Sequence, residues 1–414
     1  VHAYERLTTQ VIGCMSVSIL TPAFVYDEAA LRRALSWLAP LRAERGFKLL
    51  FSIKALPFVD ILECLRPLLD GFSVSSLFEA RLAREVLADK DVIHITTPGL
   101  RADEYPEITR RCDYLSFNSL AQWQRFRDRG RPAGRRCGLR INPGVSHLGD
   151  PRYDPCRPHS KLGAALSVVR SALDAGGADL AGLSGVHFHT MHGAHDLSPL
   201  AATLARVEEV LGAWLGRLQW INLGGGYYVD RPDGVEEFAR IVGGLQRRYG
   251  LEVLFEPGKS VVGEGACLIA SVVDVFPSEG RQVAVLDTTV AHLPEVFEYQ
   301  TSPALREAVP GGRYRYLIAG SSCLAGDLFG DYAFSEPLGV GDRLTFDGIG
   351  AYSLVKASRF NGINLPAIYA KESTGRIVLK KRYDYLDYRD QWVNGADARE
   401  REEAEPWHGE ARVR

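Results

Sequence analysis

The chain has 414 residues, of which 46% are hydrophobic and 24% charged, and its net charge is -2. This length predicts two domains, and the hydrophobic share is ample for their cores. A net charge this close to zero argues against charge-driven binding of nucleic acid or an anionic membrane. No apolar run reaches the roughly 18 residues that a membrane-spanning helix needs, so we expect neither partner.

The seven cysteines are widely spaced, and no two of them form a C-x-x-C pair. Neither a disulfide framework nor a zinc site is therefore indicated. The first residues, Val1-His2-Ala3-Tyr4-Glu5, lack the basic-then-apolar layout of a secretory signal. We expect a cytoplasmic protein without a metal.

From residue 23 onward, short apolar runs alternate with amphipathic stretches. The first run, 23–26, predicts a strand, and Asp27 then caps a helix that we expect to continue through Leu38. Further strands are predicted at 47–51, 72–74, 92–95, 114–117, 137–141, 185–189, 220–223 and 253–255, with helices at 58–69 and 77–87. This α/β alternation favours a TIM (β/α)8 barrel, with an open doubly wound sheet as the competing architecture.

The pattern changes after about residue 262, where helical stretches become few. Strand-like runs occur at 269–276, 283–286, 313–318 and 343–346. We therefore predict a barrel over 23–262 and a mostly β C-terminal domain built from 1–22 and 263–394. The charged tail, 395–414, is expected to be disordered.

Lys54, in Ser52-Ile53-Lys54-Ala55, follows a predicted strand early in the barrel. Lysine is seldom buried unless it is paired or reactive, so this position suggests a Schiff-base residue. Taken alone, a solvated cap at a strand end is the more common explanation.

Two later strand ends also carry groups suited to a cofactor. Gly224, Gly225 and Gly226 follow the strand at 220–223, and their N–H groups can surround phosphate oxygens, although such runs are often simple turns. Glu256, in Glu256-Pro257-Gly258, ends the next strand. A carboxylate there can hold a pyridinium N–H, although an isolated Glu of this kind more often precedes a helix.

His187 and His189 alternate on one strand and so point to the same face, where one of them can stack on a flat ring. No carboxylate at metal-ligand spacing accompanies them, so a metal is not predicted. Cys323 and Asp327 share a glycine-containing loop, where they can supply a proton donor and an amine-binding carboxylate. The alternative for Cys323 is a small buried apolar residue.

Taken together and in this order, these segments resemble the fold-type III pyridoxal phosphate decarboxylases. The resemblance is strongest to the carboxynorspermidine (carboxyspermidine) decarboxylase branch, and it covers roughly residues 20–392. The segments that carry it are Ser52-Ile53-Lys54-Ala55, Ser75 to Arg81, Arg140-Ile141-Asn142-Pro143, Asp154-Pro155-Cys156, Ser160 to Gly163, His187 to Thr190, Asn222 to Gly226, Glu256-Pro257-Gly258, Cys323 to Asp327, Gly330-Asp331-Tyr332, Val355-Lys356 and Phe360-Asn361-Gly362.

The resemblance implies an alanine racemase-like barrel with a β-rich second domain, and decarboxylation of an amino acid with pyridoxal 5'-phosphate as cofactor. It implies that Lys54 anchors the cofactor, that His189 stacks on its ring, and that Glu256 keeps the ring nitrogen protonated. Further cofactor-binding residues would be Gly224, Gly225, Gly226, Gly258 and Tyr352. Cys323 would return a proton to the substrate, from the second subunit of a homodimer with shared active sites.

The chain departs from that branch at the substrate pocket. Where the branch has Thr-Leu-Cys-Glu, this chain has Thr190-Met191-His192-Gly193, and Lys259 replaces a Glu after Glu256-Pro257-Gly258. The substrate-binding candidates are His192, Lys259, Glu295 and Asp327. A cation opposes binding of a protonated amine, so Lys259 either binds the cofactor phosphate or receives an anionic substrate group.

We therefore predict a decarboxylase with an altered substrate pocket, from a specialised biosynthetic pathway. The first alternative is a true carboxynorspermidine or carboxyspermidine decarboxylase of polyamine synthesis. An amino-acid racemase is a second, which Glu256 argues against because racemases of this group usually place an arginine at the ring nitrogen. A non-catalytic regulatory homologue is a third, which the intact Lys54 argues against.

Overall fold

A computed structural model describes residues 19–127, 129 and 134–393 of the chain. The predicted disordered tail, 395–414, lies outside the described residues. The chain divides into two compact units. One contains Asp27–Cys267 together with Gly348–Val355, and the other contains the described parts of 1–26, 268–347 and 356–414. The segment Gly348–Val355, which carries Tyr352, thus belongs with the barrel.

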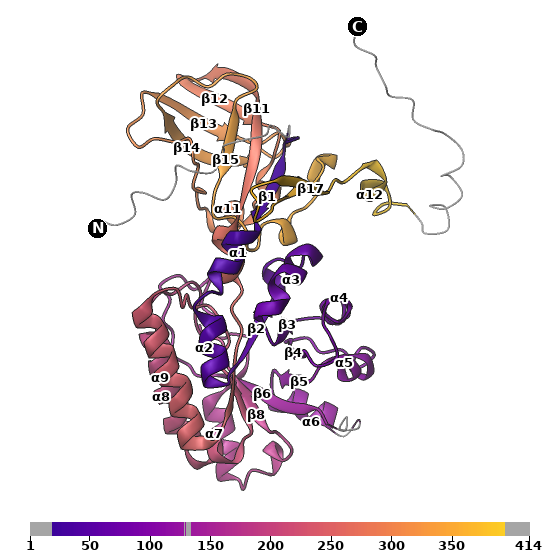
Figure 1. The fold of residues 1–414 in the computed structure, drawn as a ribbon, viewed down its shortest axis with the longest axis vertical. Helices are drawn as coiled ribbons and strands as arrows, with labels where there is room; N and C mark the ends of the chain where they lie inside the picture. The colour runs from indigo at the N-terminus through magenta and orange to yellow at the C-terminus, as the bar shows by residue number, and fades with distance from the viewer. Residues whose placement is uncertain (1–18, 128, 130–133, 394–414) are drawn as a thin grey trace. The chain divides into compact units, whose positions relative to one another are not determined.

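The first unit is a closed barrel of eight parallel strands (Figure 1). The strands are β2 (Lys48–Ser52), β3 (Gly71–Val74), β4 (Val92–Thr96), β5 (Tyr114–Phe117), β6 (Arg136–Asn142), β8 (Gly185–His187), β9 (Trp220–Asn222) and β10 (Glu252–Phe255). Strand β10 pairs with both β9 and β2, and β5 pairs with β6, so the sheet has no free edge in this ring. The short β7 (Ala164–Ala165) extends from β6. The predicted TIM barrel is confirmed.

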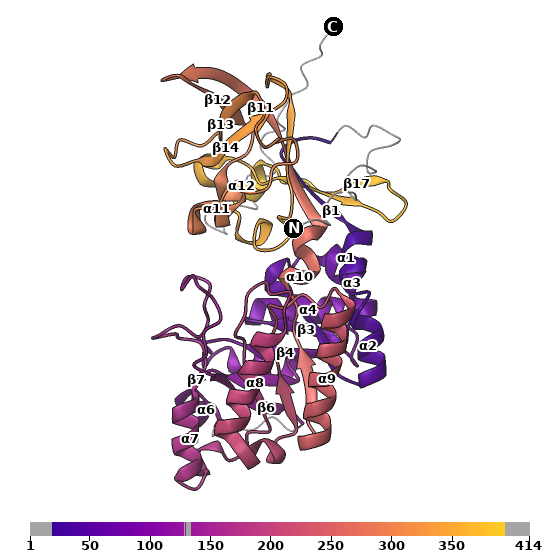
Figure 2. The same ribbon diagram turned by 90° about the vertical axis from the view of Figure 1, so that its left-hand side faces the viewer.

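Helices lie outside the barrel strands (Figures 1 and 2); α1 and α2 precede β2, and each of the others follows a barrel strand in the chain. They are α1 (Glu28–Ala34), α2 (Leu38–Arg45), α3 (Val59–Leu65), α4 (Leu77–Val86), α5 (Tyr105–Arg111), α6 (Leu120–Arg127), α7 (Leu166–Asp174), α8 (Ser198–Leu211), α9 (Pro232–Tyr249) and α10 (Lys259–Val262). Asp27 caps α1 as expected, accepting the Ala30 N–H at 2.9 Å. The helix predicted to reach Leu38 ends at Ala34, because Leu35 and Ser36 bond three residues back and tighten its last turn.

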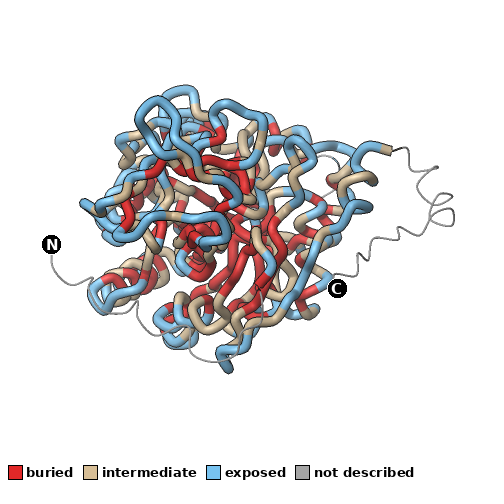
Figure 3. The backbone as a smooth tube through the Cα atoms, turned by 90° about the horizontal axis from the view of Figure 1, so that it is seen from above, coloured by how far each residue is buried: buried red, intermediate tan, exposed pale blue. Residues whose placement is uncertain are grey.

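An aromatic layer fills the barrel near the amino-terminal ends of its strands. The Trp220 indole packs edge-on against Tyr114 with ring centroids 5.4 Å apart, and Leu50 and Leu254 complete the layer. A Cβ atom on Gly185 would lie 2.1 Å from this indole, so glycine makes the room for it. Burial follows the strands, and exposure is greatest in loops (Figure 3). Because this apolar layer fills the amino-terminal end of the barrel, polar residues can gather at the carboxyl ends of the strands.

The second unit is built on a sheet with the strand order β14-β13-β12-β11-β1-β16-β17, and β15 pairs with β11. Its elements are β1 (Ala23–Asp27), β11 (Ala266–Ser278), β12 (Arg281–Leu286), β13 (Tyr314–Ala319), β14 (Leu328–Phe334), β15 (Arg343–Phe346), β16 (Ala367–Lys371), β17 (Ile377–Lys381), α11 (Pro294–Tyr299) and α12 (Tyr385–Arg389). Strand β1 was expected to open the barrel, but it lies between β11 and β16, since a buried apolar run does not specify its partners. None of the described helices combines the length and apolar character needed to cross a membrane.

Candidate active site

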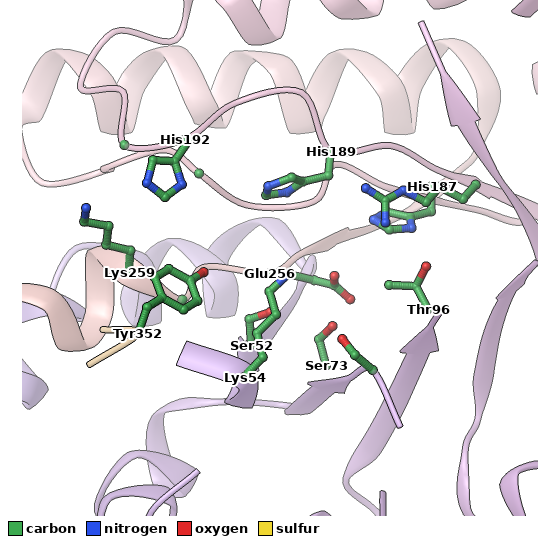
Figure 4. Close-up of a pocket in the computed structure, with 15 residues that line it drawn as sticks. Ser52, Lys54, Ser73, Thr96, His187, His189, His192, Glu256, Lys259 and Tyr352 are labelled. Atoms are coloured by element: carbon green, nitrogen blue, oxygen red, sulfur yellow. The ribbon is translucent and has the colours of Figure 1, made fainter. Parts of the chain in front are cut away.

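Side chains from the carboxyl ends of the barrel strands converge on one pocket (Figure 4). Lys54 lies in a short 3-10 helix, Ile53–Ala55, directly after β2. Glu256 follows β10, and His189 follows β8. Strands β10 and β2 are neighbours, with Phe255 opposite Leu49. Barrel closure therefore brings together Lys54 and Glu256, which are 202 positions apart in the chain.

Lys54 lines this pocket and its side chain is exposed there. Burial and then the nearby Arg140 lower the pKa of Lys54, against the opposing effect of Glu256 and Glu79. A lowered pKa increases the share of neutral amine, which is the nucleophilic form. The site therefore favours covalent chemistry at Lys54.

Glu256 is almost completely buried beside the same pocket. Burial raises the pKa of a carboxyl group, but His94, Asn222 and Ser73 together hold the pKa of Glu256 below its usual value. Asn222 donates from Nδ2 to the Glu256 Oε1 at 2.7 Å. The carboxylate is therefore ionised and held in place, as a partner for a protonated ring nitrogen must be.

His189 is held by the backbone of the glycine loop. The Gly225 N–H donates to the His189 Nδ1 at 3.1 Å, so Nδ1 carries no proton. Burial, together with the charges of Lys54 and Arg140, moves the pKa of His189 well below its usual value. The pocket thus contains a neutral, fixed imidazole ring that can lie against a flat cofactor.

The three glycines differ in what their N–H groups do. The Gly224 N–H donates to Asn222 and the Gly225 N–H to His189, so both are engaged within the barrel. Of the three, Gly226 lines the pocket. Phosphate binding by the three glycines remains a prediction, while the N–H groups of Gly224 and Gly225 orient neighbouring side chains.

These glycines also leave no room for side chains. A Cβ atom on Gly224 would lie 2.4 Å from the backbone carbonyl oxygen of Phe188. A Cβ atom on Gly225 would lie 2.1 Å from the backbone carbonyl oxygen of Glu256. At Gly226 it would lie 2.1 Å from the Met191 oxygen, and Gly258 similarly packs close to Ser52. The loop is consequently packed against the strand ends on either side of it.

Lys259, Tyr352 and His192 lie together at one end of the pocket, away from Glu256 (Figure 4). The His192 ring stacks with Tyr153, with ring centroids 5.0 Å apart, and with Tyr352, with centroids 6.4 Å apart. Burial and then Lys259 lower the pKa of His192 to about 4, so its ring is neutral near pH 7. This end of the pocket has one flexible cation, a phenol and a neutral imidazole.

Two charged residues that influence Lys54, Arg140 and Glu79, were not among the predicted site residues. Arg140 is buried on β6, and burial lowers its pKa to about 10 despite the nearby Glu256. Glu79 accepts the Ser75 N–H at 2.6 Å, and burial raises its pKa. Arg140 could have been noticed in the sequence as a charged residue inside an apolar strand. Glu79 could have been noticed as an acidic residue in the first turn of a helix that follows a strand.

Cys323, Glu295 and Asp327 belong to the second unit, and the pocket lining in the described barrel does not include them. Cys323 is exposed, in contrast to the alternative of a buried apolar residue, and its N–H donates to the Asn361 Oδ1 at 2.8 Å. Asp327 is 2% exposed and accepts the N–H groups of Val290 and Ser322 at 2.7 and 2.9 Å. Its visible role is to hold this loop; substrate binding by Asp327 and Glu295 remains a prediction.

The donor set in the barrel fits pyridoxal phosphate. Lys54 offers an amine, Glu256 an ionised carboxylate and His189 a flat neutral ring. Two buried ring nitrogens, Nδ1 of His187 and Nε2 of His192, lack a hydrogen-bond partner among the described residues that line the pocket. Across the described residues, no group of three or more His, Cys, Asp or Glu is arranged to hold a metal ion.

A closed barrel with a β-rich second unit and this pocket defines a class of pyridoxal phosphate enzymes. Residues 29–263 match the family described as "Pyridoxal-dependent decarboxylase, pyridoxal binding domain", and the chain belongs to this family. It is a pyridoxal phosphate-dependent decarboxylase, as the sequence analysis predicted.

Among characterised relatives, the carboxyaminopropylagmatine decarboxylase of Synechocystis sp. is 34% identical, over 90% of this chain and 96% of its own. The carboxynorspermidine/carboxyspermidine decarboxylase of Campylobacter jejuni is 33% identical, over 89% and 98% of the two chains. The solved carboxynorspermidine decarboxylase of C. jejuni, in complex with norspermidine, aligns with a TM-score of 0.80 at 30% identity, over 90% of this chain and all of that one.

Proposed function

We propose that this enzyme decarboxylates an amino acid in which a carboxylated aminopropyl group is joined to an amine, the class that contains carboxynorspermidine and carboxyspermidine. The supporting observation is the agreement of three relatives. Each is 32–34% identical over at least 96% of its own length, and each is named for a substrate of this class. Decarboxylation would release carbon dioxide and leave a polyamine.

Bound pyridoxal phosphate supplies an electron sink for the pair of electrons left when the carboxylate departs as carbon dioxide. In our proposal Lys54 is the covalent anchor, since its lowered pKa provides neutral amine. Glu256 holds a proton at the ring nitrogen, and His189 packs against the ring face. Gly226 and Tyr352 bind the phosphate end.

Lys259 is assigned to the cofactor phosphate in this proposal. It lies with Tyr352 and His192 at the end of the pocket opposite Glu256, and a cation beside a phenol suits a phosphate better than a protonated amine (Figure 4). Such an assignment removes the main objection to a polyamine-type substrate, namely a positive charge in its binding site.

A second candidate retains the predicted altered pocket and an anionic substrate group. The observation that favours it is that Lys259 and Gly193 both line the pocket, so a charge that the branch has there is reversed and another is missing. We rank it second because the relatives act on substrates of the polyamine class.

Cys323 remains our candidate proton donor to the substrate carbon, contributed by a second copy of the chain. Its exposure leaves the thiol accessible, and the bond from its N–H to Asn361 steadies the loop that carries it. A homodimer with shared active sites accordingly forms part of the proposal.

A carbon dioxide release assay tests the proposed substrate class. The cofactor-loaded enzyme would be offered carboxynorspermidine, carboxyspermidine, carboxyaminopropylagmatine, diaminopimelate, ornithine, and analogues with a distal carboxylate or phosphate. We expect the highest kcat/KM for one of the first three. If the anionic analogues had the highest kcat/KM, the second candidate function would be favoured. Racemisation without carbon dioxide release would reject both candidate functions.

Lys259 variants separate its two assignments. If Lys259 binds the phosphate, Lys259→Ala should weaken binding of pyridoxal phosphate about tenfold or more, as expected for a charge-assisted hydrogen bond, while Lys259→Arg should largely retain it. The KM for the amine substrate should change little in cofactor-saturated enzyme. A large rise in KM with unchanged cofactor affinity would instead identify a substrate contact.

A further inference from the structure

His94 is a fully buried polar residue in the middle of strand β4, between the apolar Ile93 and Ile95. Its Nδ1 contacts the Glu256 Oε1 at short hydrogen-bond range, and its Nε2 lies 2.7 Å from the Ser116 Oγ on the neighbouring β5. Both ring nitrogens therefore have partners on residues of the barrel interior. The ring is also edge-on to His187, with centroids 5.1 Å apart.

The hydrogen-bond partners determine which nitrogen of His94 carries a proton. An ionised carboxylate only accepts hydrogen bonds, so Nδ1 must donate to Glu256. The Ser116 hydroxyl can accept from Nε2 or donate to it, so it serves either form of the ring. The contact with Ser116 also prevents the ring from turning away from the carboxylate.

Asn222 completes this arrangement, with its Nδ2 lying 3.1 Å from the His94 Nδ1. Its Oδ1 accepts the Gly224 N–H at 2.8 Å, which orients the amide so that Nδ2 faces Glu256. Two N–H donors, from His94 and Asn222, thus converge on the Oε1 of Glu256. This leaves the other carboxylate oxygen, Oε2, without these two donors.

A buried carboxylate is costly unless charged or polar partners compensate it. Here both of these donors are directed at one oxygen of a residue that lines the cofactor pocket, although neither donor lines the pocket itself, and Ser116 supports His94.

We propose that His94, held by Ser116, is a positioning residue that keeps Glu256 ionised and oriented, and thereby sets the preference of the pocket for a ring with a protonated nitrogen. The inference rests on the proposed role of Glu256 as the partner of that nitrogen. It adds a histidine–serine pair that acts through Glu256 and does not touch the substrate.

The test compares two ligands that differ only at the ring nitrogen. Apoenzyme would be titrated with pyridoxal phosphate and with its carbocyclic analogue, in which CH replaces the nitrogen, and both dissociation constants would be read from quenching of protein fluorescence. The variants are His94→Leu, which removes the donor, and His94→Asn, whose amide can replace Nδ1. His147→Leu is the matched control, because His147 bonds Thr203 and lies outside the pocket lining.

We expect the wild-type enzyme to bind pyridoxal phosphate at least tenfold more tightly than the analogue, as a charge-assisted hydrogen bond predicts. In His94→Leu this ratio should fall several-fold through weaker binding of pyridoxal phosphate, while analogue binding stays within about twofold of wild type. His94→Asn should retain most of the ratio, and the control should retain all of it. An unchanged ratio in His94→Leu, or an equal loss for both ligands, would overturn the proposal.

Ser116→Ala provides an independent test if His94→Leu does not fold. It removes only the outer hydrogen bond and should lower the ratio by a smaller factor in the same direction; an unaltered ratio would again count against the proposal. The readout needs no amine substrate, so failure of the substrate panel and failure of this inference are separately visible.

Discussion

The backbone N–H of Gly225 donates to Nδ1 of His189 at 3.1 Å, and so the glycine loop orients the ring that faces the pocket. Because Nδ1 accepts this bond, the proton of the neutral ring lies on Nε2. The first two N–H groups of the loop thus hold the side chains of Asn222 and His189.

Gly225→Ala should destabilise the barrel unit and weaken cofactor binding. The new Cβ would lie 2.1 Å from the backbone carbonyl oxygen of Glu256, so either the glycine loop or the segment after β10 must move. We expect a loss of about 1–3 kcal/mol in the free energy of unfolding, measured by urea denaturation of the apoenzyme. Gly99→Ala is the control, because a Cβ there meets open space. Equal stability of the two variants would contradict the close packing described above.

Lys54→Ala should remove the covalent attachment of the cofactor while leaving the fold intact. Borohydride reduction of the loaded enzyme should join the cofactor to a peptide containing Lys54, as located by mass spectrometry, and no labelled peptide should appear in the variant. Lys161→Ala serves as the control at an exposed lysine. Labelling that persists in Lys54→Ala would reject Lys54 as the anchor.

Cys323→Ala should lower kcat by about 10²–10⁴-fold if the thiol is a positioned acid. If Cys323 comes from the second subunit, mixing inactive Lys54→Ala with inactive Cys323→Ala enzyme should restore activity, because some dimers then contain one intact site. Random exchange between two subunits predicts recovery of roughly a quarter of the wild-type rate. No recovery, despite subunit exchange verified by native mass spectrometry, would argue against a shared site.

His292 should make stability depend on pH between about 4 and 6.5. Burial lowers the pKa of His292 to about 4, so between these values the unfolded chain binds a proton that the folded protein does not. The contribution of the neutral, buried His292 to the free energy of unfolding is complete above pH 6.5 and is lost as the pH falls towards 4. It amounts to about 3 kcal/mol at 1.36 kcal/mol per pKa unit.

His292→Asn removes the titrating group and retains an amide near Thr288, which lies 2.9 Å from the His292 Nδ1. Urea denaturation midpoints of both proteins from pH 4 to 7.5 measure the difference. The stability of the variant should fall less steeply on acidification below pH 6.5; parallel profiles would show that His292 is not responsible.

The residues with the clearest chemistry could be predicted from the sequence. Lys54, His189 and Glu256 each stand at the end of a predicted strand, and all three line the pocket. Periodicity also identified the eight barrel strands, but it could not assign β1, whose buried apolar run suits either sheet. The strands β14, β16 and β17 were not predicted, since their patterns are short and mixed with polar residues.

The contribution of His94, Ser116 and Asn222 could not be read from the sequence. Each lies in a short apolar strand, where an isolated polar residue has no visible partner. Their hydrogen bonds span 22 to 162 residues and depend on which strands are neighbours and on which side chains point inward. Sequence spacing within one strand contains none of this information.

The amino-acid sequence by itself determined the kinds of chemical group and their places at strand ends: an amine, a carboxylate, an imidazole and a glycine loop. Only the tertiary structure decided how they act together. Closure of the barrel through β10 and β2 places Glu256 and Lys54 at one pocket, and the enclosure there lowers the pKa of Lys54. Desolvation and hydrogen-bond direction arise from neighbours distant in the chain, and therefore exist only once the barrel has closed.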